Sequence, residues 1–193
     1  MEILLAVTGA LWLALEVGLI ARDRARGKGS TDEDRGTRGL NFALIISAIV
    51  IADVLTAVLS KHSLLWLPGA SPNGWPVITG LVVIWVGLAI RVWAINTLGR
   101  SFRTTVEVDA AQSVVRHGPY RLVRHPAYTG LLFVTAGFGL ASSNWPGLAV
   151  CVAAPTLAML RRIQVEEAEL TRVLGDSYRS YQGATKRLVP WLW

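Results

Sequence analysis

Three charged residues, Arg91, Arg162 and Glu166, have positions that could support chemistry. Arg91 lies inside a long apolar run, where an ionisable side chain costs roughly 2.5 to 3.5 kcal/mol and calls for a partner or a task. Arg162 and Glu166 follow another apolar run and are four residues apart, a spacing that places two side chains on one face of a helix. An arginine in such a setting can hold an anion, best a carboxylate, through its planar fork of N–H donors.

The same residues also have ordinary structural explanations. Counted at about 1.5 Å per residue from the cytoplasmic end of each predicted helix, Arg91 is about 10 Å and Glu16 about 8 Å deep. Arg91 can therefore form an ion pair with Glu16 or extend towards the membrane surface. Arg162 and Glu166 can be a simple ion pair on a solvated helix. The residues alone leave these alternatives open.

The segment GPYRLVRHPAY, residues 118–128, is a polar turn among apolar stretches. A proline disfavours helical geometry in the residue before it, so His125 and Pro126 are typical of the start of a helix. The histidines His62, His117 and His125 have no metal-ligand spacing, and we predict no metal site. Glycine-rich phosphate-binding motifs are absent from the sequence as well.

The elements that position these residues are predicted to be membrane helices. Of the 193 residues, 52% are hydrophobic and 17% are charged. A bilayer core of about 30 Å needs about 20 apolar residues in helical form. Five stretches come near that length, namely 3–21, 40–59, 77–98, 127–141 and 146–160. We therefore predict an all-α integral membrane protein with about five spans, the last two joined into a helical hairpin by the turn SSNW at 142–145.

The basic residues alternate between the two sides of the predicted membrane. Lysine and arginine number six in 22–39, one in 60–76, five in 99–126 and six from residue 161 onward. This alternation predicts that the N-terminus lies outside and that the large basic segments are cytoplasmic. Because the charges lie in loops between apolar runs, we expect the formal net charge of +6 to face a membrane surface and not nucleic acid.

The segments between and after the spans carry weaker patterns. Residues 27–39 are expected to form a flexible, solvent-exposed loop. The β-branched residues of SFRTTVEV, 101–108, predict a short extended segment. The fifth helix is expected to continue beyond residue 161, to stop at Gly175, and to be followed by a short helix from about Asp176.

An ordered string of motifs in the C-terminal half resembles the isoprenylcysteine carboxyl methyltransferase family, membrane enzymes that use S-adenosylmethionine. The string is RVWAINTLGRSF from Arg91, VVRHGPYRLVRHPAY ending at Tyr128, RIQVEE from Arg162, then LGDSYRSY and KRLVP. It covers about residues 91–190. In one position the string departs from the eukaryotic enzymes, which commonly carry asparagine where this chain has Ser101.

The resemblance implies both a methyl-donor site and an acceptor site. It places S-adenosyl-L-methionine at Val115, Gly118, Tyr120, His125, Pro126, Tyr128 and Glu166. It also implies that Arg91 lies beside the reacting carboxylate, that Arg162 is a second functional arginine, and that Glu166 and Glu167 border both sites. We thus predict one membrane domain over residues 1–193, with three spans in 1–98 and the catalytic half in 99–193.

The function that this implies is S-adenosylmethionine-dependent methylation of a lipophilic acceptor at the membrane, such as the carboxylate of a prenylated cysteine or another lipid acid. A carboxylate is already ionised at neutral pH, so it needs a cation to hold it and no general base. A phospholipid or amine N-methyltransferase is the main alternative and would use Glu166 or Glu167 as a proton acceptor. Arg91 disfavours it, because a cation repels an ammonium. A sterol-type reductase and a non-enzymatic bundle are further alternatives.

Overall fold

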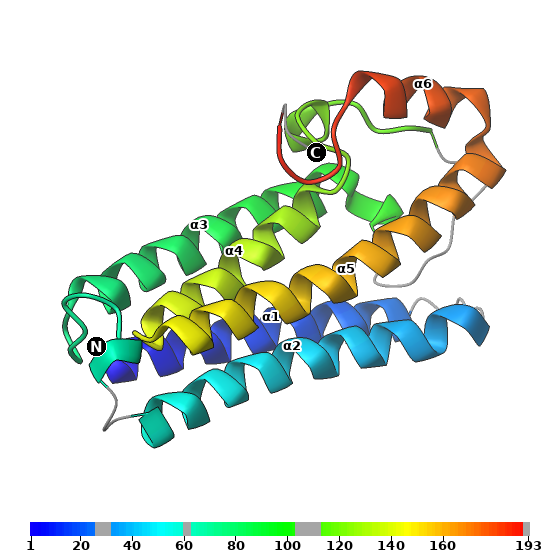
Figure 1. Ribbon diagram of the computed structural model, residues 1–193. Coiled ribbons are helices and arrows are strands. Elements are labelled where there is room, and N and C mark those ends of the chain that lie inside the picture. The colour runs from blue at the N-terminus through cyan, green and yellow to red at the C-terminus, as the bar shows by residue number, and fades with distance from the viewer. Residues whose placement is uncertain (26–31, 60–62, 103–112, 191–193) are drawn as a thin grey trace.

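The computed structural model describes residues 1–25, 32–59, 63–102 and 113–190, and α-helices make up most of this part (Figure 1). The helices are α1 Glu2–Ala25, α2 Asp32–Val58, α3 Trp75–Leu98, α4 Pro126–Ala141, α5 Trp145–Leu174 and α6 Asp176–Ala184. The first five run side by side as one elongated bundle, and α6 lies beyond one end of it (Figure 1). The prediction of an all-α fold is confirmed.

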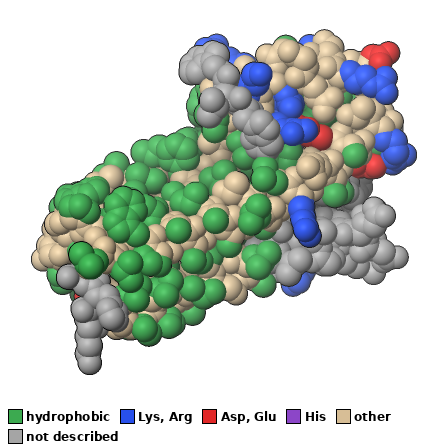
Figure 2. Space-filling view, in the orientation of Figure 1, with side chains coloured by type: hydrophobic (Ala, Val, Ile, Leu, Met, Phe, Trp, Pro, Cys, Tyr) green, Lys and Arg blue, Asp and Glu red, His purple; other side chains and the backbone are tan. Residues whose placement is uncertain are grey.

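The outer surface of the bundle suits a lipid bilayer. Three helices, α1, α3 and α5, are long and apolar enough to cross a membrane, while Phe42–Val58 and Pro126–Ala141 are shorter apolar helices. Figure 2 shows hydrophobic side chains along the length of the bundle and most of the visible charge near the α6 end. Large apolar side chains such as Ile3 and Leu157, which are 82% and 64% exposed, find an apolar solvent only in lipid. The protein is an integral membrane protein.

One predicted loop differs from the structure, and one predicted segment lies outside the described residues. Residues 32–39 are helical and belong to α2, although they were expected to form part of a flexible loop. A helix nucleated by an apolar segment extends at little cost into the polar residues beside it. The predicted extended segment falls largely at 103–112, outside the residues that the structure describes.

Glycines bring α3 and α4 unusually close together. A Cβ atom on Gly80 would lie 2.6 Å from the carbonyl oxygen of Gly137, and one on Gly87 would lie 2.6 Å from that of Gly130. The two glycines of each helix are seven residues apart and therefore lie on the same face. Small residues at such positions let membrane helices approach backbone to backbone. This seam fixes α3, which carries Arg91, against the first turns of α4.

The core of the bundle joins all five long helices. Trp12, Ile45, Ile84, Val134 and Met159 pack in one buried cluster, and each comes from a different helix. At one end, the predicted turn at 142–145 is confirmed, because the Asn144 side chain accepts a 2.7 Å hydrogen bond from the N–H of Gly147 and so caps α5. The α4–α5 hairpin is therefore fixed at its tip.

At the other end, the C-terminal segment folds back onto the segment before α4. The helix α5 ends at Gly175, whose φ of 57° is accessible to glycine at little cost, and α6 follows as predicted. Beyond α6, Val123 pairs with Lys186 in a parallel bridge. The N–H groups of Arg124 and His125 then donate to the carbonyls of Lys186 at 2.8 Å and Arg187 at 3.0 Å. The backbone of the segment Arg124, His125 and Pro126, called the RHP turn below, is thus held by residues near the end of the described chain.

Candidate active site

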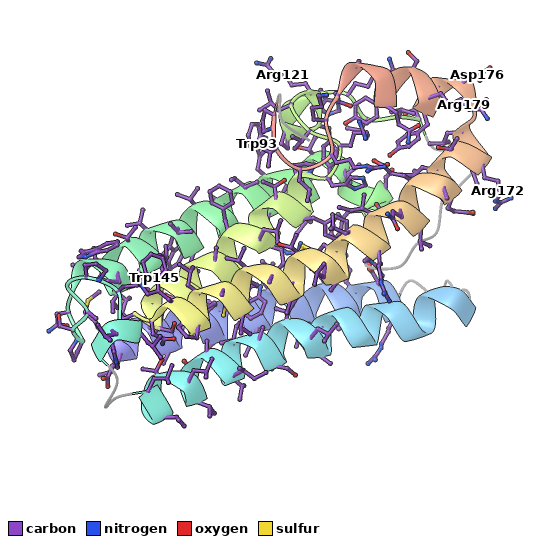
Figure 3. The ribbon with its side chains drawn as sticks, in the orientation of Figure 1. Trp93, Arg121, Trp145, Arg172, Asp176 and Arg179 are labelled. Carbon is purple, nitrogen blue, oxygen red and sulfur yellow. The ribbon has the colours of Figure 1, made fainter. Side chains whose placement is uncertain are left out.

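Trp93 and Arg121 lie near the α6 end of the bundle, whereas Trp145 marks the opposite end (Figure 3). The predicted site residues come from the second half of α3, the segment before α4, the first turn of α4 and the second half of α5. A short 3-10 helix, Gly118–Arg121, precedes α4. Gly118 has a φ of 60°, and a Cβ atom at this position would lie 3.0 Å from Oγ1 of Thr97. Both the backbone angle and the close approach to α3 require glycine at this residue.

Arg91 of α3 and Glu16 of α1 form a buried ion pair. Nε of Arg91 donates to Oε1 of Glu16 over 2.6 Å, and Nη2 donates to Oε2 over 2.7 Å. Nη1 donates to the carbonyl oxygen of Ala127 over 3.0 Å. The residues are only 5% and 7% exposed. Of the interpretations that the sequence left open, the structure shows the pair with Glu16, and this pair connects α1, α3 and the start of α4.

A second polar chain runs from α5 to α4. Nε of Arg162 donates to the hydroxyl of Tyr128 over 2.8 Å, and that hydroxyl donates to Oε2 of Glu166 over 2.9 Å. Arg162 is 7% exposed. Tyr128 thus bridges Arg162 and Glu166 and fixes the directions of both side chains.

Glu167 forms a third cluster and has three basic partners. Oε1 accepts from Nε of Arg124 at 2.8 Å and lies 3.1 Å from Nε2 of His125. Oε2 accepts from Nε of Arg187 at 3.0 Å. Arg124 also donates to the carbonyls of Gln182, at 3.0 Å, and Thr185. This cluster ties α5, the RHP turn and the C-terminal segment together.

Two of the predicted cofactor positions lie in an apolar cluster beneath the turn. Tyr120 is buried with Ala94 and Phe102, and Val115 packs against this cluster. The hydroxyl of Tyr181 donates to the carbonyl of Tyr120 over 2.5 Å. Burial raises the pKa of Tyr181 to about 12, and burial followed by the nearby negative charge of Glu166 raises the pKa of Tyr120. Both hydroxyls therefore stay neutral at physiological pH.

The two neighbouring glutamates have different surroundings, which their sequence did not reveal. Glu166 contacts Tyr128, whereas Glu167 points into the basic cluster. Nε2 of His125, which was predicted to bind the cofactor, lies within hydrogen-bond distance of Glu167. Pro126, also a predicted cofactor residue, begins α4 and precedes Ala127, whose carbonyl Arg91 contacts. Sequence reasoning gave no role to Arg124 and Arg187, two arginines whose only sequence signal is their place in the RHP and KRLVP motifs.

Comparisons with known proteins relate the chain to methyltransferases. The model of the phospholipid methyltransferase family matches residues 75–177. Protein-S-isoprenylcysteine O-methyltransferase A of Arabidopsis thaliana is 32% identical over 156 residues, which cover 79% of each chain. The human protein-S-isoprenylcysteine O-methyltransferase is 26% identical over 156 residues, 79% of this chain and 54% of that protein. A solved eukaryotic intramembrane Ras methyltransferase matches with a TM-score of 0.62 and 25% identity, covering 78% of this chain and 52% of that one.

The fold and the matched segment are those of membrane methyltransferases. Within that class, the chain belongs to the isoprenylcysteine carboxyl methyltransferase family. It spans most of the Arabidopsis enzyme but about half the length of the human enzyme and of the solved structure. Membership in a methyltransferase family implies a methyl donor of the S-adenosylmethionine type.

Proposed function

We propose that this protein is an S-adenosylmethionine-dependent carboxyl O-methyltransferase whose acceptor is an isoprenylcysteine or a similar lipophilic acid. The observation that carries the proposal is the burial of two guanidinium groups, Arg91 and Arg162, at the α6 end of a membrane bundle. A lipid-soluble acceptor reaches such a site from the bilayer only if its polar end finds fixed partners there. Guanidinium groups are the partners that suit a carboxylate.

The residues around the RHP turn fit a methyl donor that carries a cationic sulfonium and a flat base. Glycine at 118 adopts a φ of 60° and packs closely against Thr97, which positions the segment that carries Tyr120 against α3. The residues that would hold the donor are Val115, Gly118, Tyr120, His125, Pro126, Tyr128 and Glu166. When bound, S-adenosylmethionine supplies an electrophilic methyl group. The partly buried carboxylate of Glu166, fixed by Tyr128, suits a nearby positive charge.

The chain's own contribution is to align and desolvate, because an ionised carboxylate needs no proton removed. The Arg162–Tyr128–Glu166 chain holds one guanidinium and one carboxylate in fixed directions. Arg91, held by Ala127 and Glu16, supplies the second cation. Both guanidinium groups are less than a tenth exposed, so their electrostatic interactions are stronger than they would be in water. Alignment of two reactants can supply roughly 7 to 11 kcal/mol of a barrier in the most favourable systems.

An amine acceptor is not favoured. Methylation of an ammonium needs a carboxylate that takes up a proton, and Glu167 is poorly suited because three basic groups already occupy it. Two buried arginines would also repel an approaching ammonium. We further propose that the N-terminus lies outside and that the RHP turn and C-terminus are cytoplasmic, on the strength of the alternating lysine and arginine counts.

We propose that the segment 99–193 supplies most of the catalytic site. Two residues of the first three spans also belong to the site, because Glu16 and Arg91 form the pair that contacts the start of α4. In this proposal the site is built from both halves of a single membrane domain, 1–193.

The test uses detergent-solubilised full-length protein with methyl-labelled S-adenosylmethionine and an N-acetylated S-farnesylcysteine as acceptor. We expect label to enter the lipophilic fraction and to be released as methanol by mild base, since carboxyl methyl esters are base-labile. The matched control is the same acceptor as its carboxamide, which offers no carboxylate. A base-stable product, or equal labelling of the carboxamide, would overturn the proposed reaction.

A further inference from the structure

Glu16 takes up the edge of Arg91 that an acceptor carboxylate would use best. The two oxygens of Glu16 engage Nε and Nη2, which is the side-on, bidentate geometry of the guanidinium. A third donor, on Nη1, is engaged by the carbonyl of Ala127. A second carboxylate can therefore form a bidentate contact with Nε and Nη2 only if Glu16 moves away.

A buried hydrogen-bond donor without a partner among the described residues, the indole N–H of Trp12, lies one helical turn from Glu16. Trp12 is four residues earlier on the buried face of α1, and its Nε1 is buried with no hydrogen-bond partner in the described part of the chain. Side chains of a helix lean towards its N-terminus, so a glutamate at position i extends towards residue i−4. A buried N–H without a partner is rare in native proteins and calls for an explanation.

We propose that Glu16 is a displaceable counter-ion of Arg91. It pairs with Arg91 when the acceptor site is empty, turns towards the indole N–H of Trp12 when an acceptor carboxylate takes its place, and returns afterwards. This inference rests on the proposed carboxyl methylation and assigns Glu16 a role in binding the acceptor and releasing the product.

The chemistry of the reaction makes such an exchange useful. During transfer a C–O bond forms at the acceptor and the C–S bond of the donor breaks, so one negative charge and one positive charge cancel. The resulting ester is neutral and no longer competes with a carboxylate for a guanidinium. Glu16 can then pair with Arg91 again, and its return favours release of the ester over the acid.

The experiment measures equilibrium binding of two ligands, N-acetyl-S-farnesylcysteine and its methyl ester, to protein saturated with the unreactive S-adenosylhomocysteine. Glu16→Gln removes the competing charge and keeps the size of the side chain. We expect it to tighten binding of the acid about ten-fold, which equals about 1.4 kcal/mol, and to leave binding of the ester within two-fold.

Trp12→Phe gives an independent test, since it removes the N–H but keeps an aromatic ring in the core. It should weaken binding of the acid about three-fold in the native background and have no effect on a Glu16→Gln background, as expected for two coupled residues. If Glu16→Gln does not fold, the Trp12→Phe single variant decides alone, because unchanged affinity for the acid overturns the proposal.

Other outcomes are equally informative. If folded Glu16→Gln binds the acid equally or more weakly, Glu16 is a fixed positioning partner of Arg91 and the exchange does not occur. Failure of the proposed function would look different, because the native protein would then form no base-labile product and would not prefer the acid over its carboxamide. The unfolding temperature and the affinity for S-adenosylhomocysteine serve as controls for each variant.

Discussion

Two buried carboxylates, Glu16 and Glu167, lie at the same end of the bundle and differ in the number of their partners. Among the residues that the structure describes, Glu16 is paired with a single cation, Arg91, whereas Glu167 is surrounded by Arg124, His125 and Arg187. Both residues are less than a tenth exposed. A carboxylate with several partners stays bound when one of them is lost, whereas a carboxylate with one partner can be exchanged. The comparison therefore assigns Glu167 to a structural ion-pair cluster and Glu16 to a site that can respond to a ligand.

The elements that the two carboxylates connect support this division. Glu167 joins α5 to the RHP turn and to the C-terminal segment, which are also linked through backbone hydrogen bonds. Glu16 lies on α1, whose other side-chain contacts include Trp12 against Phe138 and Arg22 against the carbonyl of Phe102. Loss of the Glu167 cluster would therefore free the RHP turn and the C-terminal segment, which surround the proposed donor site. Loss of the Glu16 pair would affect mainly the contact of α1 with α3 and the start of α4.

The largest expected effect belongs to Glu167→Gln. The amide cannot neutralise three basic groups, so positive charges that are now paired would be left buried or forced to move. Removing one partner of a buried ion pair costs about 3 to 5 kcal/mol, and we expect at least this loss. The intrinsic fluorescence of the eight tryptophans reports thermal unfolding in detergent. An unchanged unfolding temperature, with an intact C-terminal segment in limited proteolysis, would show that the Glu167 cluster does not hold this segment in place.

Arg91→Ala should have the second largest effect. A matched double variant separates its effect on stability from its effect on activity. The single change leaves Glu16 buried without its cation and is expected to destabilise the protein by about 3 kcal/mol. The double variant Glu16→Ala, Arg91→Ala removes both charges, so most of the stability should return. Activity towards the farnesylcysteine acid should be lost in both.

The double variant makes the assignment of Arg91 decidable by kinetics as well as by unfolding. Binding of S-adenosylhomocysteine should stay within a few-fold of the native value, because Arg91 is assigned to the acceptor. If the double variant regains activity together with stability, Arg91 has only a structural role and the acceptor is held elsewhere.

The two carboxylates also show how far the sequence could predict the site. The pair between Glu16 and Arg91 was foreseeable, because helix geometry gave similar depths for both residues and charge inside a membrane demands a partner. The Glu167 cluster was not, since it requires the C-terminal segment to fold back and bring Arg187 beside Arg124. No local pattern encodes such a contact between segments far apart in the chain.

The same limit applies to the elements. The long apolar runs predicted the five long helices, and proline, glycine and asparagine predicted where α4 begins and where α5 begins and ends. Hydropathy could not predict that α2 begins at Asp32, because backbone hydrogen bonding continues where apolar character ends. Nor did the sequence reveal that Tyr128 would stand between Arg162 and Glu166, a contact between side chains of two different helices.

Gly130→Ala sharpens the comparison from the side of Arg91. The added Cβ would lie 2.6 Å from the carbonyl of Gly87 and 2.8 Å from the backbone nitrogen of Arg91, so α3 and α4 must separate. Overpacking of this kind costs about 1 to 3 kcal/mol. We expect a lower unfolding temperature and weaker acceptor binding, with donor binding largely retained. Gly18→Ala is the control, because a Cβ there meets no atom within 4 Å. Equal effects of the two changes would contradict the close α3–α4 seam.

The smallest effect is expected at a third carboxylate, Glu169, which completes the comparison from the exposed side. Arg172 forms two hydrogen bonds with it, at 2.8 and 2.5 Å, a geometry as good as that of the buried pairs. Yet the Arg172 side chain is 72% exposed, and it points away from the end of α5 (Figure 3). Water and salt screen such a pair, and ordering two long side chains offsets much of the attraction. Arg172→Gln should therefore leave the unfolding temperature and activity unchanged at both low and high salt. A loss similar to that of Glu167→Gln would mean that geometry, and not burial, decides what each carboxylate contributes.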